Sequence, residues 1–83
     1  MEIVISGLGS VGTTLMQELV DEGHNIVVID INAQKIENAV NKFDVKGVIG
    51  NGASASVLKE AGVQHSDLFI GATNHDELNI LCC

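Results

Sequence analysis

Gly7-Leu8-Gly9-Ser10-Val11-Gly12 is the most informative stretch of this chain, because its three glycines follow the spacing G-x-G-x-x-G. Where this pattern joins a strand to a helix, the first glycine makes a tight turn and the second lets a phosphate approach the backbone. The third lets the helix pack closely on the strand. Glycine spacings also recur by chance, so the flanking residues determine how much the pattern means.

The segments on both sides of these glycines are those that a nucleotide-binding turn requires. Glu2–Ser6 is a short β-branched run typical of a buried strand. Apolar residues then recur at helical spacing as far as Gly23, which is well placed to end a helix. Asn25–Ile29 predicts a second strand, and Asp30 follows it, 18 residues after Gly12.

Asp30 indicates which nucleotide the turn would bind. A carboxylate at the end of the second strand can accept hydrogen bonds from both hydroxyls of an adenosine ribose. The same charge would repel a 2′-phosphate, and the chain has no arginine to compensate. NAD(H) or an adenine nucleotide such as ATP or ADP is therefore favoured, and NADP(H) is disfavoured. Two alternatives remain: a tight strand-to-helix turn without a ligand, and an Asp30 that only caps a helix or is merely solvated.

Composition excludes several classes of protein. The 83 residues carry a formal charge of −7, with four lysines and only two aromatic residues, so nucleic acid is a poor partner. No apolar run approaches the ~18 residues of a membrane span, and no secretory signal is visible at the N-terminus. These features predict a small cytoplasmic domain, or part of one, without direct membrane insertion.

The rest of the chain continues the alternation of strands and helices. Four more elements are expected up to Ala72. The first two are a helix capped by Asn32, with Ile36, Ala39, Val40 and Phe43 on its apolar face, and a strand over Val45–Ile49 near a sheet edge. They are followed by a short helix capped by Ser54 and closed by Gly62, and by a strand over Asp67–Ala72. This order predicts an α/β fold: a Rossmann-like parallel sheet with helices on both faces and strand order 3-2-1-4, truncated before the later strands.

That topology predicts where a ligand would lie and what the sheet would leave open. The strand order reverses between the first and fourth strands, so the ligand should lie across their carboxyl ends, beside Gly7–Gly12 and Thr73. The outer edge of the fourth strand would be exposed. We therefore expect either a fragment of a larger domain or a domain completed by self-association, as a dimer or higher homo-oligomer.

The last segment predicts a helix. Asn74 with Glu77 three positions later resembles a capping box, and Leu78, Ile80 and Leu81 follow. Cys82 and Cys83 are adjacent, which is unfavourable for a structural disulfide, and they are interpreted as ordinary residues of that helix. The neighbouring carboxylates of Asp76 and Glu77 are too few to predict a metal site, so none is assigned.

Three stretches together are similar to one protein family. They are Gly7–Gly12 with Asp30, the loop Gly50–Ser54 leading into Val57–Gly62, and Thr73–Asn79. In the second stretch the family typically has G-D-[AG]-[ST] in the loop and L-x-x-A-G in the helix that follows. In the third stretch it typically has T-x-x-D-E-x-N. Residues 1–83 thus resemble part of the N-terminal lobe of the RCK/TrkA-N family, the nucleotide-binding regulatory domains of potassium channels and transporters.

The resemblance implies a set of binding residues. The loop after the third strand would line the adenosine side, and Thr73 would approach the phosphates or the second ribose. Asn51 departs from the family, which usually has Asp there, and it offers hydrogen bonds without a charge. The expected nucleotide-binding residues are Gly7, Leu8, Gly9, Ser10, Val11, Gly12, Asp30, Ile31, Asn51, Gly52, Ala53 and Thr73.

The resemblance also implies a role without catalysis. The chain would sense a nucleotide and regulate a membrane-embedded potassium transporter or channel subunit, at the inner face of the cell membrane. An alternative function is the cofactor-binding half of an NAD-dependent dehydrogenase, with its acid/base group and substrate domain beyond Cys83. A module that has lost its ligand and only dimerises is a third hypothesis.

Overall fold

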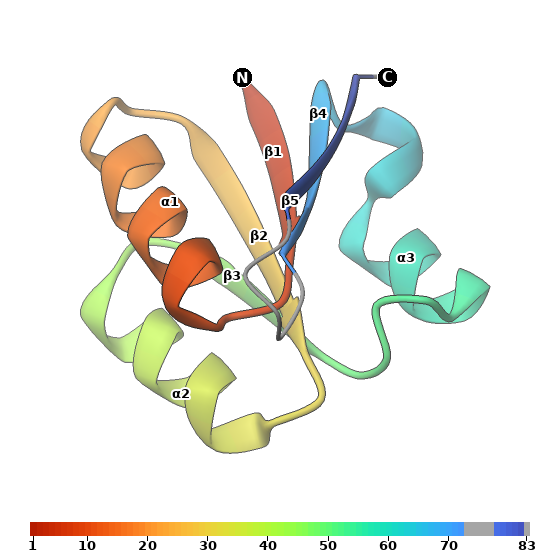
Figure 1. Ribbon diagram of the computed structural model, residues 1–83, viewed down its shortest axis with the longest axis horizontal. Helices are drawn as coiled ribbons and strands as arrows, with labels where there is room; N and C mark the ends of the chain where they lie inside the picture. The colour runs from red at the N-terminus through yellow and green to blue at the C-terminus, as the bar shows by residue number, and fades with distance from the viewer. Residues whose placement is uncertain (73–77, 83) are drawn as a thin grey trace.

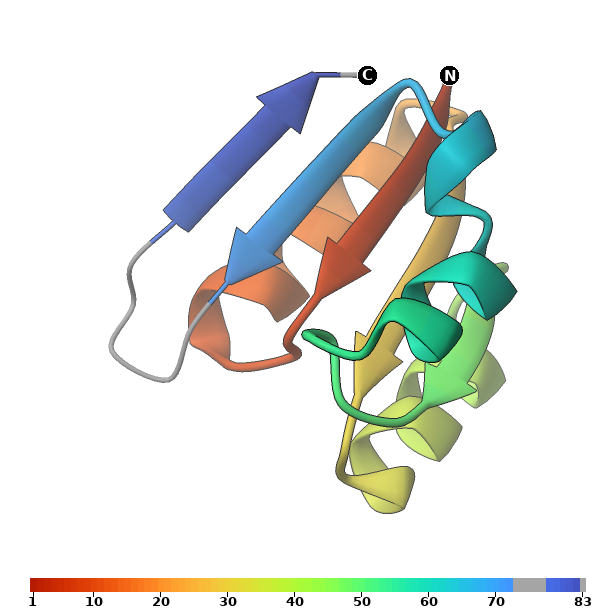
Figure 2. The same cartoon turned by 90° about the vertical axis from the view of Figure 1, so that its right-hand side faces the viewer.

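The computed structural model describes residues 1–72 in full and residues 78–82 by their backbone, and within these ranges five strands form a sheet in the order β3-β2-β1-β4-β5 (Figures 1 and 2). Strands β1 to β4 are parallel, and β5 is antiparallel to β4. The strands are β1 (Glu2–Ser6), β2 (Asn25–Asp30), β3 (Lys46–Ile49), β4 (Leu68–Ala72) and β5 (Leu78–Cys82). The parallel strands follow the predicted order 3-2-1-4.

Helices cover both faces of the sheet, as the alternation of elements predicts. Helices α1 (Ser10–Asp21) and α2 (Ala33–Lys42) lie side by side on one face, and α3 (Ala55–Ala61) lies on the other (Figure 1). A single 3₁₀ turn, Val63–His65, follows α3 within the described residues and was not expected from the sequence. The parallel part of the fold is therefore the predicted Rossmann-like arrangement.

The central strand β1 is buried on both faces because helices cover each side of it. Ile3 and Ile5 belong to the cluster beneath α1 and α2, where Met16 is also buried. Val4 points the other way, into the cluster that includes Ala61 of α3. This alternation explains why β1 reads as a continuous apolar run rather than as alternating polar and apolar residues.

Local signals set most helix ends where the sequence predicts them. The Asn32 side chain caps α2 by accepting hydrogen bonds from the backbone N–H groups of Gln34 and Lys35 at 2.9 and 3.2 Å. Gly62 ends α3 in the left-handed conformation, with φ of 81°. Ser54 is the N-cap residue of α3, but its side chain makes no capping hydrogen bond. On α2, the expected apolar residue Val40 is 43% exposed.

The predicted final helix is wrong for residues 78–82, which form β5. A short apolar run such as Leu78–Cys82 suits a strand as well as a helix turn. Pairing it antiparallel to β4 satisfies the backbone groups along the β4 edge, in a hairpin (Figure 2). The predicted open edge of β4 is therefore also wrong, because β5 covers it. The expected helix start at Asn74 lies outside the described residues.

Candidate functional site

The glycine turn lies at the carboxyl end of β1 and is fixed by its neighbours. Gly7 has φ of 101°, a conformation that favours glycine, and its N–H donates to the carbonyl oxygen of Ile29 at 2.7 Å. A Cβ atom on Gly7 would collide with the carbonyl oxygen of Ala72 at the end of β4. The turn is thus held between β2 and β4, the two neighbours of β1.

Gly12 and Gly9 lie in opposite environments. A Cβ atom on Gly12 would collide with the carbonyl oxygen of Gly7, so this glycine allows α1 to lie directly against the turn. A Cβ atom on Gly9 would meet nothing within 4 Å. Gly9 therefore has no internal packing reason to lack a side chain, and the space beside it is open to a ligand.

Helix α1 begins directly after Gly9, and its first turn suits an anion. Gly9 is the N-cap residue and contributes no side-chain hydrogen bond, and no acidic residue occupies the first turn. The first N–H groups of a helix lack carbonyl partners within the helix, and the helix dipole adds positive potential there. Together with the open space at Gly9, this end of α1 can accept a phosphate through backbone N–H groups.

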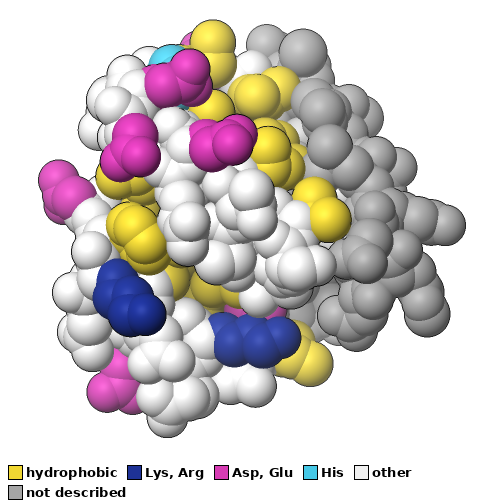
Figure 3. Space-filling view, turned by 60° about the vertical axis from the view of Figure 1, so that its left-hand side comes forward, with side chains coloured by type: hydrophobic (Ala, Val, Ile, Leu, Met, Phe, Trp, Pro, Cys, Tyr) yellow, Lys and Arg dark blue, Asp and Glu magenta, His cyan; other side chains and the backbone are white. Residues whose placement is uncertain are grey.

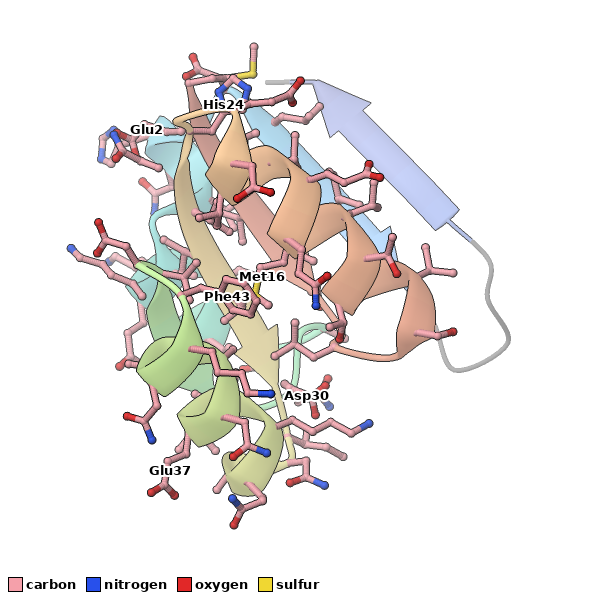
Figure 4. All side chains as sticks on the ribbon, turned by 90° about the vertical axis from the view of Figure 1, so that its left-hand side faces the viewer. Glu2, Met16, His24, Asp30, Glu37 and Phe43 are labelled. Atoms are coloured by element: carbon pink, nitrogen blue, oxygen red, sulfur yellow. The ribbon has the colours of Figure 1, made fainter. Side chains whose placement is uncertain are left out.

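The Asp30 carboxylate joins the glycine turn to α2. Its Oδ2 accepts a hydrogen bond from the Leu8 N–H at 2.8 Å, and its Oδ1 accepts one from the Asn32 N–H at 2.8 Å. Figure 4 shows Asp30 below the start of α1, beside the first turn of α2. An ionised carboxylate has about four acceptor positions, so each oxygen keeps capacity for a ribose hydroxyl.

Leu8 takes part in the turn differently from its neighbours. Its side chain is only 5% exposed and belongs to the core beneath α1 and α2. Its N–H is already bonded to Asp30. Leu8 and Gly12 are therefore buried members of the predicted turn, whereas Ser10 is exposed and Val11 is half-buried.

The loop after β3 lies against the same end of the sheet. The Gly50 N–H donates to the carbonyl oxygen of Asp30 at 3.0 Å. A Cβ atom on Gly52 would collide with the Ser6 hydroxyl at the end of β1, so the loop rests directly on that strand. The Asn51 Oδ1 accepts from the Ala53 N–H at 2.8 Å and thereby shapes the loop. The structure thus brings Asn51, Gly52 and Ala53 to the strand ends that carry the glycine turn.

Two exposed isoleucines border Asp30. Ile31 follows it directly and is 74% exposed, and Ile49 is paired with Asp30 in the register of β2 and β3 and is 58% exposed. Each adds exposed apolar surface beside the end of β2. Ile31 was among the predicted residues, whereas Ile49 was not. Its signal in the sequence was an apolar residue at the last position of an edge strand.

Thr73 lies outside the described residues, as do Asp76 and Glu77. In the described part of the chain, no group of three or more His, Cys, Asp and Glu side chains could hold a metal ion. The same residues contain no helix with the length and apolar character needed to cross a membrane. A groove in the described part of the chain has Val27, Val48 and Gly62 among its lining residues. It contains none of the residues predicted to bind the nucleotide.

These features define a class: a Rossmann-like α/β domain whose glycine turn, helix end and acidic residue converge at the carboxyl edge of a parallel sheet. The family model of the TrkA-N domain matches residues 3–83. The chain therefore belongs to the TrkA-N domain family.

Individual relatives agree with this assignment. The chain is 40% identical over all 83 residues to the Trk system potassium uptake protein TrkA of Vibrio alginolyticus and 36% identical to that of Azorhizobium caulinodans. It spans 18% of the length of each. It is 37% identical to a TrkA homolog of Methanothermobacter thermautotrophicus and spans 38% of that protein.

Proposed function

We propose that this chain binds NAD(H) or ATP/ADP across the carboxyl ends of β1, β2 and β3. The phosphates would lie at the glycine turn and the first turn of α1, and the adenosine would lie toward the loop after β3. The observation that carries this proposal is the open space beside Gly9, immediately in front of a helix end that lacks acidic residues. Backbone N–H groups there suit a pyrophosphate without any arginine.

Asp30 would bind the adenosine ribose. Its two oxygens each accept one backbone N–H at 2.8 Å, which holds the carboxylate in place, and each oxygen keeps acceptor capacity for a ribose hydroxyl. An additional phosphate on the 2′ position would meet this negative charge. We therefore expect NAD⁺ to bind more tightly than NADP⁺.

The adenine would lie between apolar side chains and the loop after β3. Ile31 lies directly after β2, and Ile49 pairs with Asp30 at the end of β3; both are exposed and offer apolar contact to a flat base. Asn51 uses its Oδ1 within the loop, and its Nδ2 has no protein partner among residues 1–72. That amide nitrogen can donate to a ring nitrogen or a ribose oxygen.

The biological role that fits is regulation rather than catalysis. The relatives are named as potassium uptake proteins of the Trk system, and we infer that this chain contributes a nucleotide-sensing domain to such a system. It would act in the cytoplasm, against a membrane-embedded potassium transporter or channel subunit, and as a homo-oligomer. A bound nucleotide regulates such an assembly only if it favours one state over another.

Calorimetric titration with NAD⁺, NADH, ATP, ADP and NADP⁺ tests the proposal, with Gly9→Ala as the diagnostic variant. The Gly9 φ of −75° is accessible to alanine, and the new Cβ meets nothing in the protein, so the fold should persist. We expect the variant to bind at least about tenfold more weakly, because the methyl group occupies the phosphate position. Exposed Asn41→Ala is the control. Equal affinity of both variants, or no binding by the unmodified chain, would overturn the proposal.

A further inference from the structure

A cleft between α1 and α2 lies outside the proposed nucleotide site. Its volume is about 190 Å³, and buried Leu8, Met16 and Ala39, with half-buried Phe43, are among its lining residues. These four side chains belong to the core beneath the two helices or pack against it. Figure 4 shows Met16 and Phe43 next to each other between the helices. The base of the cleft is therefore apolar.

The other lining residues are polar, and none of them is acidic: Thr13, Gln17, Lys35, Asn38 and Lys42. Figure 3 shows two basic side chains on this side of the molecule, with apolar atoms between them and most of the acidic groups above. The chain has only four lysines and a net charge of −7, yet two of the four line this one cleft. The cleft is thus a basic place on an acidic domain.

No carboxylate of the described residues neutralises these two lysines directly. Among residues 1–72, the one ion pair within 4 Å joins His24 to Glu22, at 3.9 Å. The Asp30 carboxylate gives its oxygens to backbone N–H groups and is not among the lining residues. Lys35 and Lys42 therefore add positive potential to the cleft, which favours an anion over a neutral molecule or a cation.

The size of the cleft limits what can enter it. Pockets for drug-sized molecules measure roughly 300–1,000 Å³, so the cleft is too small for them and for a nucleotide. An apolar cavity of about 150 Å³ is enough for benzene. The 190 Å³ of this cleft therefore suits a single ring, or a chain of similar volume, with one small charged group attached.

We propose that the cleft between α1 and α2 binds a small carboxylate whose apolar body is about as large as one aromatic ring. The apolar body would contact Met16, Ala39 and Phe43, since a ring packs favourably against another ring and against a thioether sulfur. The carboxylate would face Lys35 and Lys42. This site is separate from the proposed nucleotide site, and it does not depend on nucleotide binding.

Methyl NMR with benzoate as the probe tests this proposal at constant ionic strength. The chain has two methionines, of which Met16 lines the cleft and Met1 is 62% exposed at the N-terminus. Benzoate should move the Met16 methyl signal to saturation with a Kd of about 1–10 mM, and Met1 should stay in place. The ring of Phe43 should respond as well, whereas Phe69, which packs in the cluster beneath α3, should not.

The charge of the site is tested with Lys35→Gln and Lys42→Gln combined. Both lysines are exposed, so the fold should persist, and benzoate should bind about threefold more weakly or worse. Lys46→Gln with Lys59→Gln is the matched control, because it changes the net charge equally and neither residue lines the cleft. Benzyl alcohol, which has the ring without the charge, should bind the unmodified chain about threefold more weakly than benzoate.

Three results would overturn the proposal. The first is a Met16 methyl signal that does not move at benzoate concentrations well above the expected Kd. The second is equal binding of benzoate by the two lysine double variants, or equal binding of benzoate and benzyl alcohol. The third is loss of the Met16 shift in Gly9→Ala, which would place the anion at the glycine turn. No nucleotide is present in these titrations, so failure of the proposed function would leave their outcome unchanged.

Discussion

The Asp30 carboxylate and the Leu8 backbone N–H are 2.8 Å apart, although 22 positions separate them in the chain. This bond fastens the glycine turn to the end of β2. The residue proposed to hold the ribose is therefore also a structural support of the turn proposed to hold the phosphates. Substitution of Asp30 should consequently change both stability and binding.

Two replacements of Asp30 measure its contribution to stability. Asp30→Ala removes the acceptor for both Leu8 and Asn32, and we expect it to lower the free energy of unfolding by about 1–3 kcal/mol. Asp30→Asn keeps one acceptor oxygen and should lower it less. Urea denaturation measures both values. If the two variants were equally stable, the single oxygen that Asn retains would support neither N–H measurably.

Gly7→Ala should be among the most damaging single substitutions. It combines a positive φ with a collision of the new Cβ against the Ala72 carbonyl oxygen, for an expected loss of about 2–5 kcal/mol. Gly23→Ala is the matched control, because Gly23 has φ of 87° but nothing within 4 Å of the new Cβ. Its expected loss is about 1–2 kcal/mol. Equal losses in denaturant titrations would mean that the collision is relieved by backbone movement.

The two expected helix caps should respond differently to alanine. Asn32→Ala removes a side chain that accepts from two backbone N–H groups at the start of α2, and it should cost about 1 kcal/mol. Ser54→Ala should cost less, because the Ser54 side chain makes no capping bond to α3. Thermal unfolding followed by circular dichroism compares them. A larger effect at Ser54 would contradict the capping geometry described above.

Ile31 and Ile49 should affect nucleotide affinity without affecting the fold. Both are largely exposed, so Ile31→Ala and Ile49→Ala should leave the unfolding free energy within about 0.5 kcal/mol. Each should weaken NAD⁺ or ATP binding about three- to tenfold, because apolar contact with the base is lost. Val40→Ala, at an exposed position on α2, is the control. Affinity unchanged in both isoleucine variants would place the adenine elsewhere.

The parts of the fold that were predicted correctly are those in which a local residue pattern is compatible with only one structure. The glycine spacing with Asp30 required strand, turn, helix and strand in that order, and Asn32 marked the start of α2 because its side chain can cap a helix. The parallel order followed from right-handed crossovers between alternating elements. These constraints lie within about 30 residues of one another and do not depend on distant contacts.

The features that were missed depend on distant neighbours. Leu78–Cys82 has no local pattern that distinguishes a strand from a helix turn, and the adjacent edge of β4 decides the outcome. Ile49 is a site candidate only because the register of β2 and β3 places it beside Asp30. Val40 was assigned to the apolar face of α2, but its exposure depends on how α2 lies over the sheet.

The position of β1 between β2 and β4 also determines when, during synthesis of the chain, the glycine turn can complete its contacts. The Glu2 N–H donates to the Asp67 carboxylate, and the glycine turn packs against Ala72, so the first strand needs partners made more than 60 positions later. As the chain leaves the ribosome, β1 can pair with β2 early, but its other edge remains unpaired until β4 has been synthesised. The turn proposed to bind the nucleotide is thus translated first and completed last, and a nascent chain that stops before Ala72 should not bind the nucleotide.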